Sequence, residues 1–407
     1  MRVSKTQPRR PFPRQSLSLI LLWAYLAPLV LLLASLALLA APAGAVTQFG
    51  SYGTGAGEFI EPNGIAVDQH TGDVYVVDTN NARIEKFTKD GGFLLAWGWG
   101  VADGKTQALQ TCTTTCFAGA RGSGAGQLQF AEGIAVDNDP RSPSYEDVYV
   151  VDIENNRVQK FSPTGKFLLM FGGEVNHTAD THHEASNEGI CPINPGDQCT
   201  AGTQGNGNGQ FDFTVEGSFI AVGPNGIVYV GSHNSIEEFS AEGLYQSQIK
   251  LLPAPVATGT PEAGGTSGLA INAEGDLYVI RHGTAGIDEY EPSGNLIRNL
   301  DNDGEPAYAE GPTPTIAVDP AGDLFVDVHV DERHHVDEYN AAGAKLVSFD
   351  YDMADGLHGI AYDERGNALY VVSTSPTTAR VRVLTPPPPP PFTSTSSELA
   401  TLLIPEL

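Results

Sequence analysis

Two histidine clusters and two acidic runs hold the side chains best suited to metal chemistry in this sequence. HTADTHHE at residues 177–184 and VHVDERHHVDE at 328–338 group imidazoles with carboxylates, and DNDGE at 301–305 and DYDMADG at 350–356 contain fragments of calcium-binding loops. Neither histidine cluster has a ligand spacing set by a regular element, and neither acidic run has the full calcium loop with its terminal glutamate. We therefore interpret the histidines as solvated loop residues and the acidic runs as turns.

Nucleophilic and phosphate-binding motifs are absent from the sequence. It has no G-x-S-x-G elbow, and glycine-rich runs such as GTGAGEF at 53–59 have no P-loop lysine and no helical pattern after them. We interpret these runs as crossings between strands that need unusual backbone angles.

A phrase of about five residues recurs along the chain and predicts the elements that position any site. GIAVD or a close variant occurs six times, at 64–68, 133–137, 219–223, 268–272, 315–319 and 359–363. Five of the six copies are followed by a turn with glycine, and all six by a phrase such as VYVVD at 74–78. Short apolar runs bounded by turn residues indicate strands covered on both faces.

A third phrase such as RIEKF at 83–87 and a fourth such as FLLAWG at 93–98 complete each unit. Four short antiparallel strands per repeat predict an all-β fold, a six-bladed β-propeller. The sixth unit ends at RVRVL without a fourth strand, whereas VTQFG at 46–50 stands alone before the first unit. We therefore expect residues 46–50 to complete the last blade and close the ring, which removes an exposed edge.

The stretch from GAGEF to FLLAWG, residues 55–98, resembles an NHL repeat, and residues 46–384 resemble a six-bladed NHL-type propeller. In the first two repeats Asp78 and Arg83 recur as Asp152 and Arg157 at the same separation. The resemblance implies that each pair joins the second and third strands rather than binding a ligand. In the later repeats the acid is replaced by Ser232, Arg281, Val328 and Ser373.

Propellers bind ligands at the mouth of the central channel, so the residue before each GIAVD-like phrase marks the predicted site. These residues are Asn63, Glu132, Ser218, Ser267, Pro314 and His358. We predict that the five polar ones line the mouth, either as ligand contacts or as a solvated rim.

Two enzymatic branches with this fold provide the alternative interpretation. Peptidyl-hydroxyglycine lyases hold zinc with histidines near this position, where the sequence offers only His358 and thus too few ligands. Lactonase-like propellers hold channel calcium with hard oxygen ligands, a type that Asn63 and Glu132 provide. The metal ligands predicted by this alternative are Asn63, Glu132 and His358, with calcium as the cofactor.

The N-terminal 45 residues have the pattern of an export signal. Five basic residues and no acid lie in residues 1–15, residues 16–45 carry no charge, and Ala43-Gly44-Ala45 forms a small-x-small cleavage site. The apolar stretch is also long enough for an uncleaved membrane anchor. In both interpretations the rest of the chain is exported, so it is expected to be secreted or associated with the cell envelope.

Four cysteines lie in two insertions, TCTTTCFAG at 111–119 and ICPINPGDQCTAG at 190–202. An exported chain with an even cysteine count favours disulfides over zinc. We expect the local pairs Cys112 with Cys116 and Cys191 with Cys199, although a link between the insertions remains open.

Beyond Ala45 the chain keeps 17 of its 22 basic residues and all 49 acidic residues, a net charge of −32. This charge repels phosphate backbones and argues against nucleic-acid binding. Residues 385–407 contain six consecutive prolines, a stiff spacer, followed by a short tail. We predict a monomeric, exported binding scaffold for a protein, peptide or glycan; the alternative is a calcium-dependent lactonase-like or lyase-like enzyme.

Overall fold

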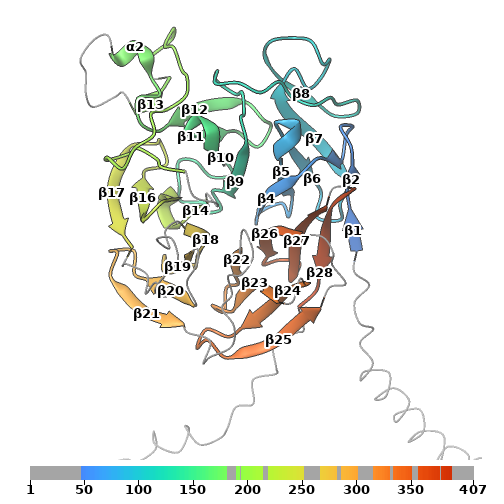
Figure 1. Cartoon of the computed structure of the whole chain (residues 1–407), viewed down its shortest axis with the longest axis vertical. Helices are drawn as coiled ribbons and strands as arrows, with labels where there is room; N and C mark the ends of the chain where they lie inside the picture. Colours follow the sequence, from blue (N-terminus) through green and yellow to red (C-terminus); the bar gives the residue numbers. More distant parts are fainter. Residues whose placement is uncertain are drawn as a thin grey trace, which may run out of the picture. The chain divides into compact units, whose positions relative to one another are not determined.

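The chain folds into a ring of six β-sheets, each with its first strand near the centre (Figure 1). The computed structural model describes residues 47–180, 189–192, 194–213, 219–251, 266–281, 286–300, 315–330, 333–350, 356–375 and 377–386. The predicted export segment at 1–45 and most of the proline-rich tail lie outside these residues. Within the described ranges, no helix is long and apolar enough to cross a membrane.

Each blade has four antiparallel strands in the order expected from the repeat, which confirms the predicted fold. The strands of blades 1 to 3 are β4 (Pro62–Val67), β5 (Val74–Asp78), β6 (Arg83–Phe87) and β7 (Phe93–Trp99); β9 (Ala131–Val136), β10 (Val148–Asp152), β11 (Arg157–Phe161) and β12 (Phe167–Phe171); β14 (Ile220–Val222), β15 (Val228–Ser232), β16 (Ser235–Phe239) and β17 (Tyr245–Lys250). Those of blades 4 to 6 are β18 (Thr266–Ile271), β19 (Leu277–Arg281), β20 (Ile287–Tyr290) and β21 (Leu296–Leu300); β22 (Ile316–Val318), β23 (Leu324–Val330), β24 (Arg333–Tyr339) and β25 (Lys345–Asp350); β26 (Gly356–Asp363), β27 (Ala368–Ser375), β28 (Thr378–Leu384) and β1 (Thr47–Phe49).

The apolar second strands are explained by packing on both faces. Every residue of β5 is buried. Because side chains alternate across a strand, Val74 and Val76 pack toward blade 6, whereas Tyr75 and Val77 pack toward blade 2. The core is therefore a set of apolar layers between neighbouring blades, and each blade depends on both of its neighbours.

Strand β1 closes the ring as the sequence predicts. Thr47 pairs with Val383 and Phe49 with Val381, so β1 is the outer strand of blade 6. The Phe49 ring also lies 4.8 Å from the Phe87 ring of blade 1. A short parallel pair, β2 (Ser51–Tyr52) with β3 (Glu58–Phe59), continues the same crossing.

The two cysteine insertions add strands that the repeat does not contain. Strand β8 (Leu109–Cys112) extends blade 1 beyond β7, and β13 (Ile190–Cys191) extends blade 2 beyond β12. Disulfides join Cys112 to Cys116 and Cys191 to Cys199, the local pairs expected from the sequence. The insertions therefore cover two outer sheet edges that would otherwise be exposed.

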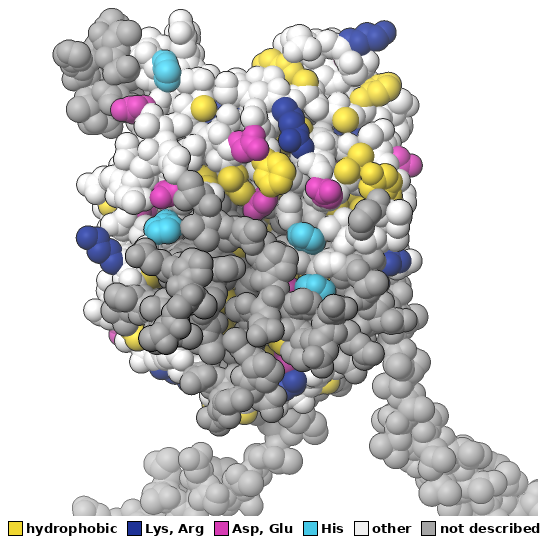
Figure 2. All heavy atoms as spheres, in the orientation of Figure 1, with side chains coloured by type: hydrophobic (Ala, Val, Ile, Leu, Met, Phe, Trp, Pro, Cys, Tyr) yellow, Lys and Arg dark blue, Asp and Glu magenta, His cyan; other side chains and the backbone are white. Residues whose placement is uncertain are grey.

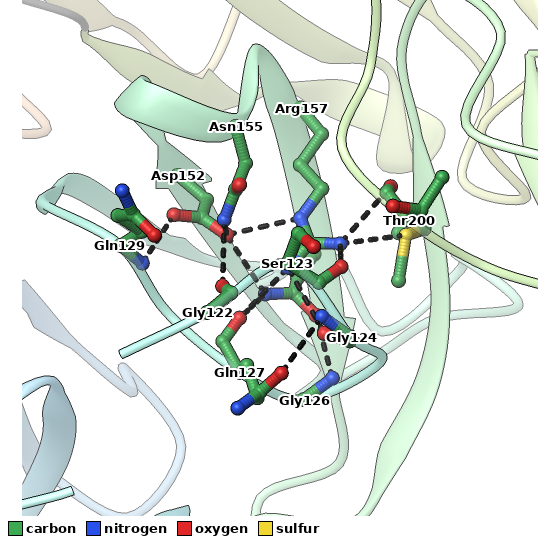
Figure 3. Close-up of polar contacts among 12 residues, drawn as sticks. Gly122, Ser123, Gly124, Gly126, Gln127, Gln129, Asp152, Asn155, Arg157 and Thr200 are labelled. Atoms are coloured by element: carbon green, nitrogen blue, oxygen red, sulfur yellow. Dashed lines mark hydrogen bonds and ion pairs between the residues drawn. The ribbon is translucent and has the colours of Figure 1, made fainter. Parts of the chain in front are cut away.

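A buried ion pair anchors the glycine-rich crossing before each of the first two blades. In blade 2, Arg157 Nε donates to Asp152 Oδ2 at 2.9 Å, and Asp152 Oδ1 accepts from the Gln129 amide at 2.7 Å (Figure 3). The guanidinium also donates to four backbone carbonyls, those of Ser123, Gly124, Gln127 and Thr200. Asn155 Nδ2 donates to Asp152 Oδ2 and to a further carbonyl of the crossing.

The same arrangement holds blade 1. Arg83 lies 2.9 Å from Asp78, and its other nitrogens donate to the carbonyls of Thr54, Gly55, Glu58 and Phe117. Both arginine side chains are fully buried. The predicted pairing of aspartate with arginine across the second and third strands is confirmed. The arginine of each pair binds mainly the carbonyls of the crossing loop.

A second intrablade ion pair is present in blades 1 and 2, and blade 5 has a carboxylate at the position of its cation. Lys86 Nζ lies 2.9 Å from Asp73 and 5.0 Å from the ring centre of Tyr75, the residue opposite it on β5. Blade 2 repeats this arrangement with Lys160, Asp147 and Tyr149. In blade 5 the position of the lysine is taken by Glu338, opposite Phe325 on β23.

Glu338 therefore places a carboxylate where blades 1 and 2 place an ammonium. Its side chain is 7% exposed. Burial, followed by the charges of Asp323 and Asp319, raises the pKa of Glu338 to about 7. The carboxyl is largely protonated in mildly acidic solution and becomes a buried, repelled anion at higher pH.

Removing the buried guanidinium should destabilise the fold strongly. We expect Arg157→Ala to lower the free energy of unfolding by about 3–5 kcal/mol, because Asp152 then remains buried without its cation. Urea unfolding followed by tryptophan fluorescence measures this change. Arg141→Ala is the matched control, since Arg141 is an exposed partner of Asp139, and it should change stability by less than about 1 kcal/mol. Equal effects of the two variants would contradict the anchoring role.

Blade 5 should make stability depend on pH around neutrality. The pKa of Glu338 in the folded chain lies above the unfolded value of 4.5. The contribution of Glu338 to the free energy of unfolding is therefore fully present below pH 4.5 and is lost as pH rises through about 7. Relative to Glu338→Gln, we expect the wild type to lose about 1–3 kcal/mol of unfolding free energy between pH 5 and pH 8. Glu338→Lys should raise stability at pH 8 by pairing with Asp323. Parallel pH curves for wild type and Glu338→Gln would refute this account.

Candidate functional site

The starts of the six innermost strands enclose a cavity of about 80 Å³ at one end of the central channel. We call it the channel mouth. Each blade contributes lining residues, and the side chains predicted from the sequence that meet there are Asn63, Glu132 and His358. Ser218 and Pro314 lie outside the described residues, and the Ser267 side chain is not described. Three of the predicted positions are therefore brought together on the adjacent blades 6, 1 and 2.

Asn63 is held by the turn that links the second and third strands of its own blade. The turn contains the short helix η1 (Thr79–Asn81). Asn63 Nδ2 donates to Thr79 Oγ1 at 3.1 Å, and Thr79 Oγ1 donates to the Ala131 carbonyl at 2.7 Å. This relay fixes Asn63 and joins blade 1 to the beginning of β9, beside Glu132.

Close backbone contact explains why glycine begins the repeated phrase in these blades. A Cβ on Gly64 would lie 2.1 Å from the Glu132 carbonyl oxygen, and a Cβ on Gly359 would lie 2.5 Å from the Asn63 carbonyl oxygen. The absence of a side chain therefore lets the inner strands of blades 6, 1 and 2 approach one another closely. The same contact sets the spacing between Asn63, Glu132 and His358.

His358 is a neutral imidazole in the channel mouth. Its Nδ1 atom is buried and has no hydrogen-bond partner. Burial, with the nearby charge of His334, lowers the pKa of His358 to about 4. His334 Nδ1 in turn lies 3.4 Å from the buried carboxylate of Asp327. The mouth therefore combines a carboxylate, an amide and an unprotonated imidazole, groups that accept hydrogen bonds or face a cation.

The histidine cluster at 328–338 does not form the solvated loop that we expected. It forms the hairpin of β23 and β24, in which His329 is opposite His334. His335 Nε2 lies 3.4 Å from Asp337, and the His334 and His335 side chains are both mostly buried. The first acidic run and most of the second lie outside the described residues, as do residues 181–184 of the HTADTHHE cluster. The other half of that cluster forms the short helix α2 (His177–Asp180).

Phe219 and Thr315 also line the channel mouth, and the sequence analysis missed them. They occupy the first position of the repeated phrase, where the other four copies have glycine. That substitution was the available signal, because a side chain at this position must point toward the channel or displace a neighbouring strand. The mouth is consequently glycine-lined on one side and has an aromatic ring on the other.

The proposed calcium ligands remain a prediction. In the part of the chain that the structure describes, no three His, Cys, Asp or Glu side chains are grouped so that they could hold a metal ion. Asn63 and Glu132 provide hard oxygen ligands, but Asn63 is oriented by its bond to Thr79. The lining thus fits a guest with hydrogen-bond donors better than it fits a metal ion, which needs several convergent ligands.

Comparison with known proteins identifies the repeat. Residues 59–87, from β3 to the end of β6, match the NHL repeat. The chain contains an NHL repeat. The propeller is 30% identical over 148 residues to Protein brain tumor of Drosophila melanogaster, a match covering 31% of this chain and 14% of the relative. It is 50% identical over 46 residues to the B-box type zinc finger protein ncl-1 of Caenorhabditis elegans, covering 11% and 5%.

Solved structures with a similar arrangement include enzymes. A gluconolactonase from Xanthomonas campestris has a TM-score of 0.48 at 12% identity, covering 85% of this chain and 98% of that protein. Virginiamycin B lyase from Staphylococcus aureus has a TM-score of 0.47 at 13% identity, covering 84% and 99%. At these identities the likeness concerns the fold alone and assigns no activity to this NHL propeller.

The ionisation of His358 can be measured directly. Because its pKa is lowered to about 4, we expect the imidazole to remain neutral from pH 8 down to pH 5. Unfolded histidine protonates near pH 6.5, so this residue should destabilise the fold as pH falls from about 6.5 toward 4. NMR titration of the histidine ring signals, with His358→Gln to assign the resonance, tests this expectation. A His358 midpoint near pH 6.5 would show that the ring is solvated.

Proposed function

We propose that this chain is an exported NHL-type propeller that acts as a binding scaffold and seats part of a protein or peptide partner at the channel mouth. The observation that carries this proposal is the size of the mouth, about 80 Å³. Pockets for small-molecule ligands usually measure about 300–1,000 Å³. A cavity this small suits one projecting side chain of a larger partner.

The loops around the mouth support a contact with a large partner. The cysteine insertions reach the same end of the blades as Asn63, because the Gly119 amide donates to the Asn81 carbonyl and the Gly202 amide to the Asn155 carbonyl, both at 2.7 Å. Asn81 belongs to the turn that holds Asn63. Binding residues commonly lie on loops that a rigid scaffold positions, and here the disulfides brace these loops.

Export is part of the same proposal. The charge pattern of residues 1–45 supports it, and so do the two disulfides, which persist in oxidising compartments. The proline run after β28 would then hold the propeller away from whatever follows it. The scaffold would act in the cell envelope or outside the cell.

A displayed random peptide library tests the binding proposal. Peptides enriched on the propeller should lose at least about tenfold in affinity for the double variant Glu132→Gln/His358→Gln, because each change alters a group that lines the mouth. Asp90→Asn is the matched control, since Asp90 lies in the exposed turn between β6 and β7, outside the mouth. Failure to enrich peptides, or enriched peptides insensitive to the double variant, would overturn the proposal.

The same experiment distinguishes the calcium-dependent enzyme. The peptide selection is repeated, and the melting temperature of the propeller is measured, once with added calcium and once with a chelator. The scaffold predicts equal melting temperatures and equal peptide binding in both conditions. A calcium-dependent rise in melting temperature that disappears in the double variant would instead favour the enzyme, with Asn63, Glu132 and His358 as ligands.

A further inference from the structure

The opposite end of the channel opens into a larger hollow of about 370 Å³, which we call the lower funnel. It is lined where the first strand of each blade turns toward the second. All six blades contribute, through Gln69, Asn138, Gly223, Asn272, Asp319 and Glu364. Its volume falls within the usual range for small-molecule sites of about 300–1,000 Å³, unlike that of the channel mouth.

The amide groups on one side of the lower funnel are engaged in joining blades. Gln69 Nε2 donates to the Tyr362 carbonyl at 2.7 Å, and Gln69 Oε1 accepts from the Glu364 amide at 3.0 Å. Asn138 accepts from the Gln69 amide at 2.8 Å and donates to the Val67 carbonyl at 3.1 Å. These bonds hold blades 6, 1 and 2 together, so these two side chains form a rigid wall.

The charge in the lower funnel is not balanced. Arg141 is the one basic residue among those that line it, and its guanidinium pairs with Asp139 at 2.8 Å. Asp319 and Glu364, on the adjacent blades 5 and 6, have no ion pair with a basic side chain among the described residues. Burial and the charge of Asp319 raise the pKa of Glu364, and burial raises the pKa of Asp319. A cation between the two carboxylates would relieve this repulsion.

The Asp319 carboxylate is already oriented. Its Oδ1 atom accepts from the Ala321 amide at 2.9 Å and from the Asp323 amide at 2.8 Å. The Glu364 backbone is fixed by its bond to Gln69. The two acids therefore sit on turns held by hydrogen bonds, so little ordering is required when a guest binds.

The facing wall is apolar. Val222, Ile271 and Val318, the last residues of the first strands in blades 3, 4 and 5, line the lower funnel and remain partly exposed. The equivalent Val67 and Val136 of blades 1 and 2 are only 4% and 5% exposed. Blades 3 to 5 therefore present uncovered apolar surface opposite the engaged amides.

We propose that the lower funnel binds a small amphipathic amine, with its ammonium group between Asp319 and Glu364 and its apolar part against Val222, Ile271 and Val318. This site is separate from the channel mouth and shares no lining residue with it. The net charge of −32 beyond Ala45 favours the approach of a cation over an anion. Figure 2 shows the face at the other end of the channel, where acidic side chains are also exposed.

Calorimetric titration of the full exported chain with phenethylamine at pH 7.5 and low salt tests the proposal. We expect phenethylamine to bind at least tenfold more tightly than 2-phenylethanol, and phenylacetate not to bind, because the site selects an ammonium. Glu364→Gln and Asp319→Asn should each weaken binding about tenfold, the effect of losing one charge-assisted contact. Asp90→Asn removes one negative charge at the exposed turn between β6 and β7 and should leave binding unchanged.

The apolar wall has its own test. Val318→Ser should weaken phenethylamine binding severalfold while leaving the weaker binding of ethylamine unchanged, since ethylamine has no large apolar group to bury. Circular dichroism confirms that each variant is folded. Equal affinity for the amine and the alcohol, or amine binding that neither acid variant weakens, would overturn the proposal without affecting the channel mouth. Loss of peptide binding at the mouth alone would leave this inference in place.

Discussion

A guanidinium group buried among backbone carbonyls is the interaction on which blades 1 and 2 of this propeller depend. A crossing loop rich in glycine has no strand partner for its carbonyls. Arg157 supplies donors to three of them and to the Thr200 carbonyl of the second cysteine insertion, while Asp152 neutralises its charge. Asp152 then fixes Gln129, two residues before β9. The crossing therefore fixes where β9 begins at the channel, and this sets the position of Glu132.

The later blades retain only part of this interaction. In blade 3, Ser232 stands in place of the acid, and its Oγ accepts from the Asp212 amide at 2.9 Å. This bond is equivalent to the one that Asp152 accepts from the Gln129 amide in blade 2. One hydrogen bond to the crossing survives where the ion pair does not. The same gradation appears at the inner strands, where glycine gives way to Phe219 and Thr315. Blades 6, 1 and 2 therefore form the closely packed side of the ring, whereas blades 3 and 5 have larger channel-facing groups at this position and blade 4 keeps Gly268.

The repeat predicts which residues face the channel, but it does not predict how wide the channel is. Register follows from the period of the phrases, so β1 and the Asp78–Arg83 pair could be placed from sequence. Width depends on contacts such as Gly64 with the Glu132 carbonyl, which link blades about 70 residues apart. Strands β8 and β13 were missed because short strands in cysteine-rich insertions have no alternating pattern. The lower funnel was missed because Asp319 and Glu364 have the residue types of ordinary turns.

The pairing of β1 with β28 constrains when the ring can close during synthesis of the chain. Thr47–Phe49 is synthesised before the other strands of the ring, and its partner Val381–Val383 follows more than 300 residues later. Until both are present, blade 6 has an open edge and Phe49 lacks its place beside Phe87. All six blades must therefore be synthesised before the ring can close, and a premature stop anywhere before β28 leaves every preceding blade in an open arc.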